Sequence, residues 1–342
     1  MTGLRIVDVG TVGAMRSQSL WHGIASAMSP NSVPTLSFCH PGEAYVCLGY
    51  HRSLEEIDAA ACREQGLGVI RRQIGGGPVY IDRDQLFFQI TFPSDQAPAR
   101  VDRLYKRFLA PAVAAFRQLG LPAQLRGLND IAVDDRRLSG TGAGQIGDAV
   151  TVVGNIIFRF PHQRMAELLA VPTDRMRREC LRLMCRHVSS LEAEGLSAIT
   201  LEQVKETLIA SYSERLGLSP FRDSLTATEE QAVARWEGRF AQPQWLDGPR
   251  LAERTGRQVK ICADVWVYAS KKNGISIEAS VVGDLLEAVS IDATHLDGLA
   301  GRMSDELVGQ RADARSVSVC LAPYGADGRE VLELLEPGLT LH

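Results

Sequence analysis

The amino-acid sequence predicts an α+β fold: a mixed β-sheet flanked by helices, followed by a small C-terminal α+β domain. Three observations lead to this prediction. Strand-like and helix-like segments are mixed rather than strictly alternating, which favours a mixed sheet over a doubly wound one. The run 149–158 is almost continuously apolar, as in a strand that is buried on both faces. From Gln258 onward the pattern becomes rich in strands.

The first part of the chain is expected to supply the main sheet and its helices. Apolar patterns predict strands at 4–9, 34–39, 44–48, 69–72, 123–126, 129–133 and 150–160. Helices are expected at 17–28, 54–65, 101–119, 162–169, from Pro172 onward and at 200–217. Ser53 is a good N-cap for the helix 54–65. The apolar residues of 101–119 recur on one helical face, which indicates packing against a core.

The remainder of the chain is expected to form a connector and a small domain. The connector contains one helix at 229–240, followed by Pro243 and Pro249. Beyond it the pattern predicts strands at 259–268, 275–282, 285–291 and 316–321 and a helix at 295–308. The expected division is therefore a main domain over 1–217, a helical connector over 218–250 and an accessory domain over 251–342.

Composition narrows the class of protein. The chain has 342 residues, a hydrophobic content of 45% and a net charge of −4, which gives no reason to expect nucleic acid as a partner. No apolar stretch reaches the length of a membrane span, and the N-terminus lacks the pattern of a secretion signal. Seven cysteines without a Cys-x-x-Cys pair argue against a zinc or disulfide framework. A cytoplasmic protein is expected.

Residues 71–77 are the most informative stretch of the chain. Arg71 and Arg72 precede three consecutive glycines, Gly75–Gly77. Glycine lets the backbone approach a ligand closely, and the arginines add fixed positive charge. A plain flexible turn is the alternative interpretation. Apolar residues at Val79 and Ile81 and the run 86–88 indicate that two strands hold this loop in place.

A second polar stretch lies about fifty residues further on. Asn129-Asp130 leads into an apolar strand, and Asp134-Asp135 is typical of a tight turn. Residues 136–144 follow as a second basic loop of small residues. Asn129-Asp130 could also do no more than start a strand. Gly154-Asn155 lies in an apolar strand, where a glycine marks close packing or a ligand, and packing is favoured.

These two stretches resemble the lipoate–protein ligase family, whose relatives include the biotin ligases. That family shows Arg-Arg-x-x-Gly-Gly-Gly-x-Val-Tyr/Phe, then an Asn-Asp strand, then Arg-Lys-Ile-Ser-Gly. Residues 71–80, 129–130 and 138–140 match in order and spacing. The resemblance covers about residues 1–215 and, more weakly, about 250–325. The Gly-Arg-Gly-Arg-type loop of biotin ligases is absent, which favours lipoate over biotin.

The resemblance implies a reaction in two steps. Lipoate and Mg-ATP give lipoyl-AMP and pyrophosphate, and a lysine of a carrier domain then attacks the mixed anhydride. ATP, Mg²⁺ and lipoate are the implied cofactors and substrate. The implied partner is a lipoyl carrier domain, such as a subunit of a 2-oxoacid dehydrogenase or the glycine cleavage H protein. No nucleic acid and no membrane are expected as partners.

The resemblance also assigns roles to particular residues. The residues implied to bind substrate or adenylate are Arg71, Arg72, Gly75, Gly76, Gly77, Tyr80, Asn129, Leu138, Ser139 and Gly140. Asp130 is implied to act near the phosphate and to bind the metal. Arg137 stands where the family has its catalytic lysine.

Two positions depart from the family pattern. Arg137 keeps the positive charge of the lysine but is bulkier, planar and never deprotonated. Our hypothesis is that ligand binding is partly retained while transfer is slowed. Lysine is scarce in this chain, at positions 106, 205, 260, 271 and 272, so a tolerated exchange of lysine for arginine is the competing explanation. Ile81 replaces a histidine that many relatives carry.

Two other functions stay open. Octanoyl and lipoyl transferases of this fold use a cysteine nucleophile and no ATP. Cys47, Cys180 and Cys185, the last two with His187 nearby, do not lie where such a nucleophile is expected. A relative that binds lipoate or a carrier without catalysis is the other alternative. Arginines that cluster within 175–186 form either a solvated helix face or a docking surface for an acidic carrier; they are Arg175, Arg177, Arg178, Arg182 and Arg186.

Overall fold

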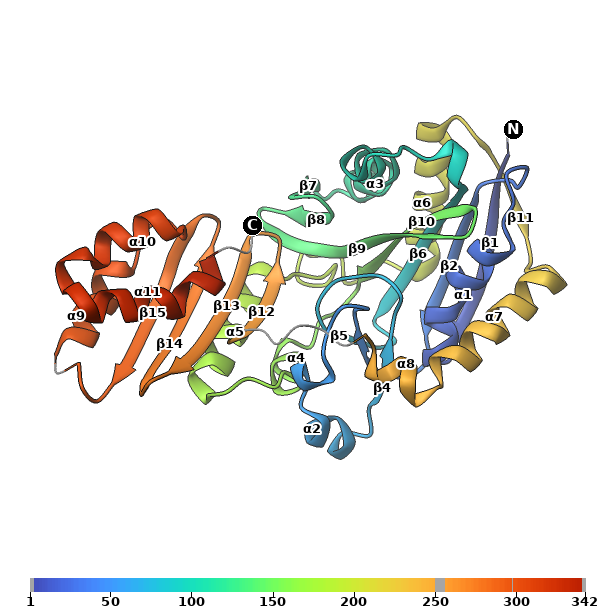
Figure 1. The fold of residues 1–342 in the computed structure, drawn as a ribbon. Coiled ribbons are helices and arrows are strands. Elements are labelled where there is room, and N and C mark those ends of the chain that lie inside the picture. The colour runs from blue at the N-terminus through green and yellow to red at the C-terminus, as the bar shows by residue number, and fades with distance from the viewer. Residues whose placement is uncertain (1–2, 250–255, 297, 340–342) are drawn as a thin grey trace. The chain divides into compact units, whose positions relative to one another are not determined.

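The computed structural model describes residues 3–249, 256–296 and 298–339, and its α+β class agrees with the prediction (Figure 1). The chain forms two compact units. One comprises Met1–Pro161 and Ser189–Leu251, and the other His162–Val188 and Ala252–His342. These units differ from the expected division, because the connector 218–250 belongs to the first unit and residues 162–188 belong to the second.

The first unit contains a mixed sheet of eight strands. They lie in the order β11-β1-β2-β6-β10-β9-β8-β7. Their bounds are Gly3–Val12 (β1), Thr35–Pro41 (β2), Gln85–Pro93 (β6), Gln124–Arg126 (β7), Asp130–Val133 (β8), Arg136–Ile146 (β9), Ala149–Ile157 (β10) and Ser219–Asp223 (β11). Strand β1 runs parallel to β11 and β2, and the other neighbouring strands are antiparallel.

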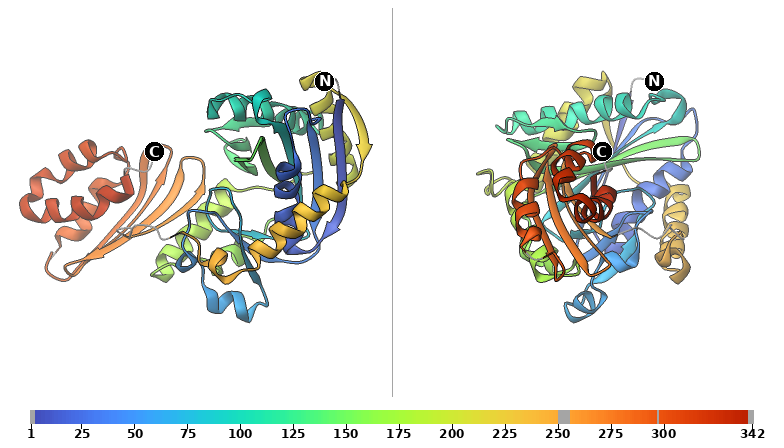
Figure 2. Two further views of the ribbon diagram at one scale, coloured as in Figure 1. Left: turned by 45° about the vertical axis from the view of Figure 1, so that its right-hand side comes forward. Right: turned by 60° about the vertical axis from the view of Figure 1, so that its left-hand side comes forward.

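Helices cover both faces of this sheet (Figure 2). They are α1 (Ala14–Ala27), α3 (Val101–Gln118), α6 (Leu201–Leu216) and α7 (Ala227–Phe240). Because side chains alternate along a strand, Leu36 and Phe38 of β2 enter the core beneath α3 and α6. Cys39 points to the opposite face, where it packs with Leu20 and Val233 of α1 and α7.

A small three-stranded sheet also belongs to the first unit. It has the order β4-β3-β5, with bounds Tyr45–Leu48 (β3), Gly68–Arg71 (β4) and Val79–Ile81 (β5). The helix expected at 54–65 is broken into a 3₁₀ turn, Leu54–Glu56, and α2, Ala59–Glu64. Asp58 causes the break, because its carboxylate accepts hydrogen bonds from the amides of Ala60 and Ala61 and so caps a new helix. A second 3₁₀ turn is Ser94–Gln96, and α8 is Pro243–Asp247.

The second unit is built on an antiparallel sheet, β12-β13-β14-β15. The strands are Arg257–Cys262 (β12), Val265–Lys272 (β13), Ile275–Val282 (β14) and Leu285–Ala293 (β15). The helices are α4 (His162–Glu167), α5 (Asp174–His187), α9 (Leu299–Leu307), α10 (Ala314–Leu321) and α11 (Gly325–Leu339), with a 3₁₀ turn at Ala322–Tyr324. Ile277 and Ala279 pack with α9, α10 and α11, whereas Glu278 faces α5.

Two expectations for this unit are wrong. The single strand expected at 259–268 is a hairpin, because the chain turns at Asp264, where φ is +59°. The strand expected at 316–321 is helix α10. Its alternating apolar pattern imitates a strand, but Asp313 caps a helix there, and Val317 and Leu321, four residues apart, are buried together.

The arginines of α5 hold this helix on its own sheet. Arg175 forms ion pairs with Glu278 at 2.8 Å and with Asp292 at 2.5 Å. Arg182 and Arg186 both contact the carboxylate of Glu287, at 2.8 and 2.7 Å. Three of the five arginines therefore form ion pairs within the second unit, and their side chains stay 43–56% exposed.

Candidate active site

The triglycine loop joins β4 to β5, and both strands pair with β3. This confirms the expectation that strands hold the loop on either side. The amide of Tyr50 donates to the carbonyl oxygen of Ile74 at 2.9 Å. Gly76 has a φ of +101°, which side chains rarely allow. Gly49 lies so close to the loop that a Cβ atom there would stand 2.0 Å from the carbonyl oxygen of Gly76.

Arg72 determines the shape of this loop from within. Its Nη2 donates to the carbonyl oxygens of Gly75 at 2.8 Å and Gly77 at 3.0 Å. Its Nη1 donates to the carbonyl oxygen of Cys47 on β3 at 3.1 Å. The side chain thus turns the loop carbonyls inward and leaves the backbone of Gly75 and Gly76 exposed. A loop whose outer surface is bare backbone can accept close approach of a ligand.

The side chain of Arg71 is buried against backbone carbonyls, in contrast to that of Arg72. The residue is 0% exposed. Its guanidinium donates to the carbonyl oxygens of Gly49, Tyr50 and Arg52, at 2.6–3.0 Å. It also donates to those of Leu246 and Asp247 in α8. Burial lowers the pKa of Arg71. A guanidinium has five N–H donors, and these carbonyls use them up.

The second polar stretch is a hairpin rather than a strand and a loop. Asp134 and Asp135 have φ values of +45° and +65°, as in a two-residue hairpin turn, so the tight turn expected there is confirmed. The loop expected at 136–144 is wrong. This segment is strand β9, because it pairs with β8 on one side and β10 on the other.

A bulge in β9 distributes the residues of this hairpin between core and site. Ile131 pairs with Ser139 while Ala132 pairs with Arg137, so Leu138 is the extra residue. The side chain of Leu138 is 1% exposed and packs in the main core. The amide group of Asn129 is also occupied, because it donates to the carbonyl oxygen of Thr141 at 2.6 Å. Asp130 is 6% exposed and pairs across the hairpin with Gly140.

Arg137 lies beside Gly140 on β9 and carries an unpartnered polar atom. Within the described residues, Arg137 Nε is buried without a hydrogen-bond partner. Ser139 Oγ is also unpartnered, but Ser139 pairs with Ile131, which packs in the main core. A Cβ atom on Gly140 would lie 4.0 Å from Cζ of Arg137 and 3.8 Å from Oδ1 of Asn155. The neighbouring Arg136, by contrast, is paired with Glu194 at 2.9 Å. Buried polar atoms rarely lack partners, so the guanidinium of Arg137 is suited to binding an anionic ligand.

The glycine loop and β9 are in direct contact. Ile74, which precedes the triglycine, lies over Gly142 and Gly144 of β9, and a Cβ atom on Gly142 would be 2.7 Å from its Cδ1. The two glycines therefore make room for the loop. The two stretches that the sequence singled out meet in the structure through Ile74. Tyr80, at the end of the loop, is buried at 2% exposure.

Sequence reasoning did not assign Gln85, Asn155 or Ile74 to the site. Asn155 was considered but interpreted mainly as packing, which holds for its neighbour: a Cβ atom on Gly154 would stand 2.4 Å from the ring of Phe88. Asn155 accepts a hydrogen bond from the amide of Gly140 at 3.0 Å. The sequence did contain one signal for Gln85, because it is a polar residue at the start of an apolar strand.

Thiols and metal ligands are poorly placed in the first unit. Cys39, Cys47 and Cys62 are all buried, and burial raises the pKa of each thiol, that of Cys39 to about 12. Across the described ranges, no three His, Cys, Asp or Glu side chains gather as a metal site would require. None of the helices in the described part of the chain combines the length and apolar character that crossing a bilayer needs.

The fold and the site define an α+β domain in which a glycine-rich loop faces a cationic hairpin. Solved lipoate ligases have this fold. A structure from the archaeal lipoylation system of Thermoplasma acidophilum, described as a bi-partite lipoate protein ligase and its E2 lipoyl domain, superimposes with a TM-score of 0.67 at 22% identity. The alignment covers 74% of this chain and 99% of that chain.

Residues 19–213 match the family model of the lipoyl protein ligase A/B catalytic domain, and the chain belongs to this family. Lipoate-protein ligase LplJ of Bacillus subtilis is 28% identical over 157 residues, which is 46% of each chain, so the match spans about half the length of that relative. Octanoyltransferase LipM of Moorella thermoacetica is 23% identical over 236 residues, 62% of this chain and 86% of that protein. Relatives thus include both ligases and transferases.

Proposed function

We propose that this protein is an ATP-dependent lipoate–protein ligase, which forms lipoyl-AMP and transfers the lipoyl group to a lysine of a carrier domain. One observation carries the proposal: a permanently charged guanidinium, that of Arg137, has its buried Nε unpartnered beside Gly140. A buried, charged donor without a partner is suited to binding an anion. The acyl phosphate of lipoyl-AMP supplies one, in a family that includes lipoate–protein ligases.

The chemistry assigns a role to Arg137 in both steps. In the first, a carboxylate oxygen of lipoate attacks the α-phosphorus of ATP and pyrophosphate leaves. In the second, the lysine amine attacks the acyl carbonyl, the C–O bond to AMP breaks, and the nitrogen loses a proton as the amide forms. Negative charge develops on oxygen each time. A fixed cation or donor at such an oxygen lowers the barrier by roughly 3–4 kcal/mol.

The remaining residues hold the adenylate. The exposed backbone of Gly75 and Gly76, shaped by Arg72, would lie against the acyl chain and phosphate. Asp130 would supply a carboxylate to a Mg²⁺ ion. This ion would arrive with the nucleotide phosphates, since Mg²⁺ is commonly held by one or two carboxylates together with substrate phosphates. The bound ion would neutralise charge on the leaving pyrophosphate.

An ATP-independent octanoyl transferase is the second candidate, because LipM proteins are among the relatives. That chemistry needs a reactive thiolate. In the first unit the thiols of Cys39, Cys47 and Cys62 are buried, and their pKa values are raised. Cys185 is exposed but lies on α5 in the second unit. The buried thiols favour the ligase over the transferase.

One assay separates these functions. The purified protein is incubated with a lipoyl carrier domain, lipoate or octanoate, and ATP, and carrier and nucleotides are followed by mass spectrometry. We expect lipoyl-AMP and an ATP-dependent mass increase on a carrier lysine. Transfer from an octanoyl-thioester donor without ATP, blocked by iodoacetamide, would establish the transferase instead. Binding of lipoyl-AMP without turnover would indicate a non-catalytic relative.

The variant Arg137→Lys tests the role of the arginine within the same assay. If arginine slows transfer, lysine should raise carrier loading by about ten- to a hundredfold. Equal rates for the two proteins would show that arginine serves as well as lysine. Arg136→Lys is the matched control, because Arg136 is paired with Glu194 rather than with the proposed ligand.

A further inference from the structure

A chain of side-chain hydrogen bonds connects the two halves of the candidate site. The amide of Gly140 donates to Oδ1 of Asn155 at 3.0 Å. Nδ2 of Asn155 donates to Oε1 of Gln85 at 2.8 Å. Nε2 of Gln85 donates to the carbonyl oxygen of Tyr80 at 3.0 Å. This relay begins on β9 three residues from Arg137 and ends on β5, three residues after the triglycine.

The direction of the relay is determined by its two ends. A backbone N–H can only donate and a backbone carbonyl can only accept. Asn155 must therefore present its oxygen to Gly140 and its nitrogen to Gln85, which in turn must present its nitrogen to Tyr80. Both side-chain amides are fixed in one orientation. Gln85 is 1% exposed, so water does not replace these bonds.

The relay is attached to β9 at Gly140, which lies next to Arg137. The Gly140 amide is occupied by Asn155, so Gly140 serves the site through its backbone position and its missing side chain. A Cβ atom on Gly140 would be about equally near Cζ of Arg137 (4.0 Å) and Oδ1 of Asn155 (3.8 Å). Arg137 Nε has no hydrogen-bond partner among the described residues, so no bond at this atom adds to the hold of the β9 backbone on the side chain.

We infer that Asn155 and Gln85 are positioning residues, which set the distance between the cation of Arg137 and the triglycine loop. This inference rests on the proposed function. It concerns residues that bind neither adenylate nor metal and act only through Gly140 and Tyr80. A small displacement of a group that stabilises charge reduces the rate far more than it reduces folding stability.

The test uses near-isosteric variants that cannot hydrogen-bond, Asn155→Leu and Gln85→Met, and their combination. Rates of lipoyl-AMP formation are measured together with KM for lipoate and ATP and with the melting temperature. We expect kcat to fall about tenfold or more, with a smaller change in KM. The double variant should lose no more than either single variant, because both break one relay.

Strands β6 and β10, which carry Gln85 and Asn155, also offer a matched control. Thr91 on β6 and Thr151 on β10 form a buried hydroxyl pair at 3.1 Å, and both residues are 0% exposed. Thr91→Val and Thr151→Val remove this bond without touching Gly140 or Tyr80. They should lower the melting temperature comparably and leave kcat within about twofold. Equal losses of kcat in relay and control variants would reduce the relay to a structural role and overturn the inference.

Amide hydrogen exchange gives a readout that does not depend on activity. The segment 136–146 should exchange faster in Asn155→Leu than in the wild type or in Thr151→Val, since the Gly140 amide loses its acceptor. An unchanged exchange rate of this segment overturns the inference whether or not the protein is catalytically active. An active wild type with equally active relay variants overturns the inference alone, whereas a wild type that forms no lipoyl-AMP overturns the proposed function. Should Asn155→Leu fail to fold, Gln85→Met alone breaks the relay and leaves the Gly140 bond in place.

Discussion

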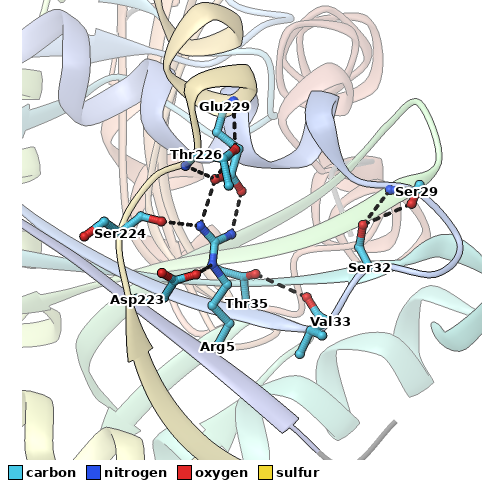
Figure 3. Close-up of polar contacts among 9 residues, drawn as sticks. All are labelled: Arg5, Ser29, Ser32, Val33, Thr35, Asp223, Ser224, Thr226 and Glu229. Atoms are coloured by element: carbon cyan, nitrogen blue, oxygen red, sulfur yellow. Dashed lines mark hydrogen bonds and ion pairs between the residues drawn. The ribbon is translucent and has the colours of Figure 1, made fainter.

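The guanidinium of Arg5 and the carboxylate of Glu229 form a two-point ion pair, with Nη1–Oε1 and Nη2–Oε2 distances of 2.6 and 2.8 Å (Figure 3). Arg5 lies on β1, and Glu229 lies in the first turn of α7. Glu229 also accepts from the amide of Thr226 at 2.8 Å and so caps this helix. The pair ties α7, which lies in the segment expected as a helical connector, to the first strand of the chain.

Breaking this pair should destabilise the first unit. The side chains of Arg5 and Glu229 are only 11% and 8% exposed, and without Glu229 the guanidinium would keep Asp223, which is 48% exposed, as its carboxylate partner. Glu229→Gln is expected to lower the free energy of unfolding by about 2 kcal/mol, because it removes charge-assisted hydrogen bonds. Chemical denaturation followed by tryptophan fluorescence measures this, because Trp236 and Trp245 follow Glu229 on α7 and α8. Glu206→Gln is the control: it removes an ion pair with Arg222 whose side chains are 61% and 52% exposed, and should cost less than about 1 kcal/mol.

Gly49→Ala should displace the triglycine loop. Its new methyl group would lie 2.0 Å from the carbonyl oxygen of Gly76, and a backbone atom cannot yield as a flexible side chain can. We expect a loss of about 1–3 kcal/mol in stability and a higher KM for lipoate. Gly75→Ala is the comparison, since nothing lies within 4 Å of its new Cβ atom and stability should not change. Identical melting temperatures for the two variants would contradict the packing of Gly49 against the loop.

Local signals were predictable from the sequence, whereas contacts across the fold were not. The Asp134-Asp135 turn and the strands around the triglycine follow from a few neighbouring residues. Arg71 and Arg72 are adjacent and chemically identical, yet one is buried on carbonyls and the other shapes the loop. The partners that bury Arg71 include Leu246 and Asp247, which lie about 175 residues further along the chain. No local pattern distinguishes the two arginines.

The bulge at Leu138 was unpredictable for a similar reason. The pattern Arg-Leu-Ser-Gly does not reveal which residue faces the core, because the answer depends on the register with β8. Of the two residues that follow Leu138, Gly140 adjoins Arg137, whereas Ser139 pairs with the core residue Ile131. Asn155 was undervalued because its function depends on Gln85, seventy residues earlier in the sequence.

Substitution by alanine should impair lipoyl-AMP formation at Gly140 and folding stability at Gly154. At Gly140 the nearest atom to a new Cβ is 3.8 Å away, so Gly140→Ala should change stability by less than about 0.5 kcal/mol. Its methyl group would adjoin Arg137, however, and should hinder lipoyl-AMP formation. Gly154→Ala would place its Cβ 2.4 Å from the ring of Phe88 and should cost about 1–3 kcal/mol. Paired melting curves and adenylation rates check both; an unstable Gly140→Ala would argue against open space beside Arg137.

His22 lies in an aromatic cluster between α1 and α7. It is 0% exposed, and its Nδ1 hydrogen-bonds the carbonyl oxygen of Gln18 at 2.6 Å. The rings of Trp21, Trp236 and Phe240 surround it, with centroids 3.4–4.9 Å away. Burial lowers the pKa of His22 from 6.5 to about 3, and the positive charge of Arg239 acts in the same direction. The imidazole is therefore neutral in the folded protein at neutral pH.

This burial predicts an acid-dependent loss of stability. Between pH 6.5 and about 3 the unfolded chain binds a proton at His22 that the folded protein does not bind, so stability falls as the pH falls through this window. The contribution is absent above the unfolded pKa and reaches on the order of 2 kcal/mol at pH 5. His22→Gln removes the titrating group, so the difference in unfolding free energy between wild type and variant should shift in favour of the variant by that amount between pH 7 and pH 5. Urea titrations at the two pH values measure the shift. A difference that does not change with pH would mean that the imidazole of His22 can take up a proton in the folded state.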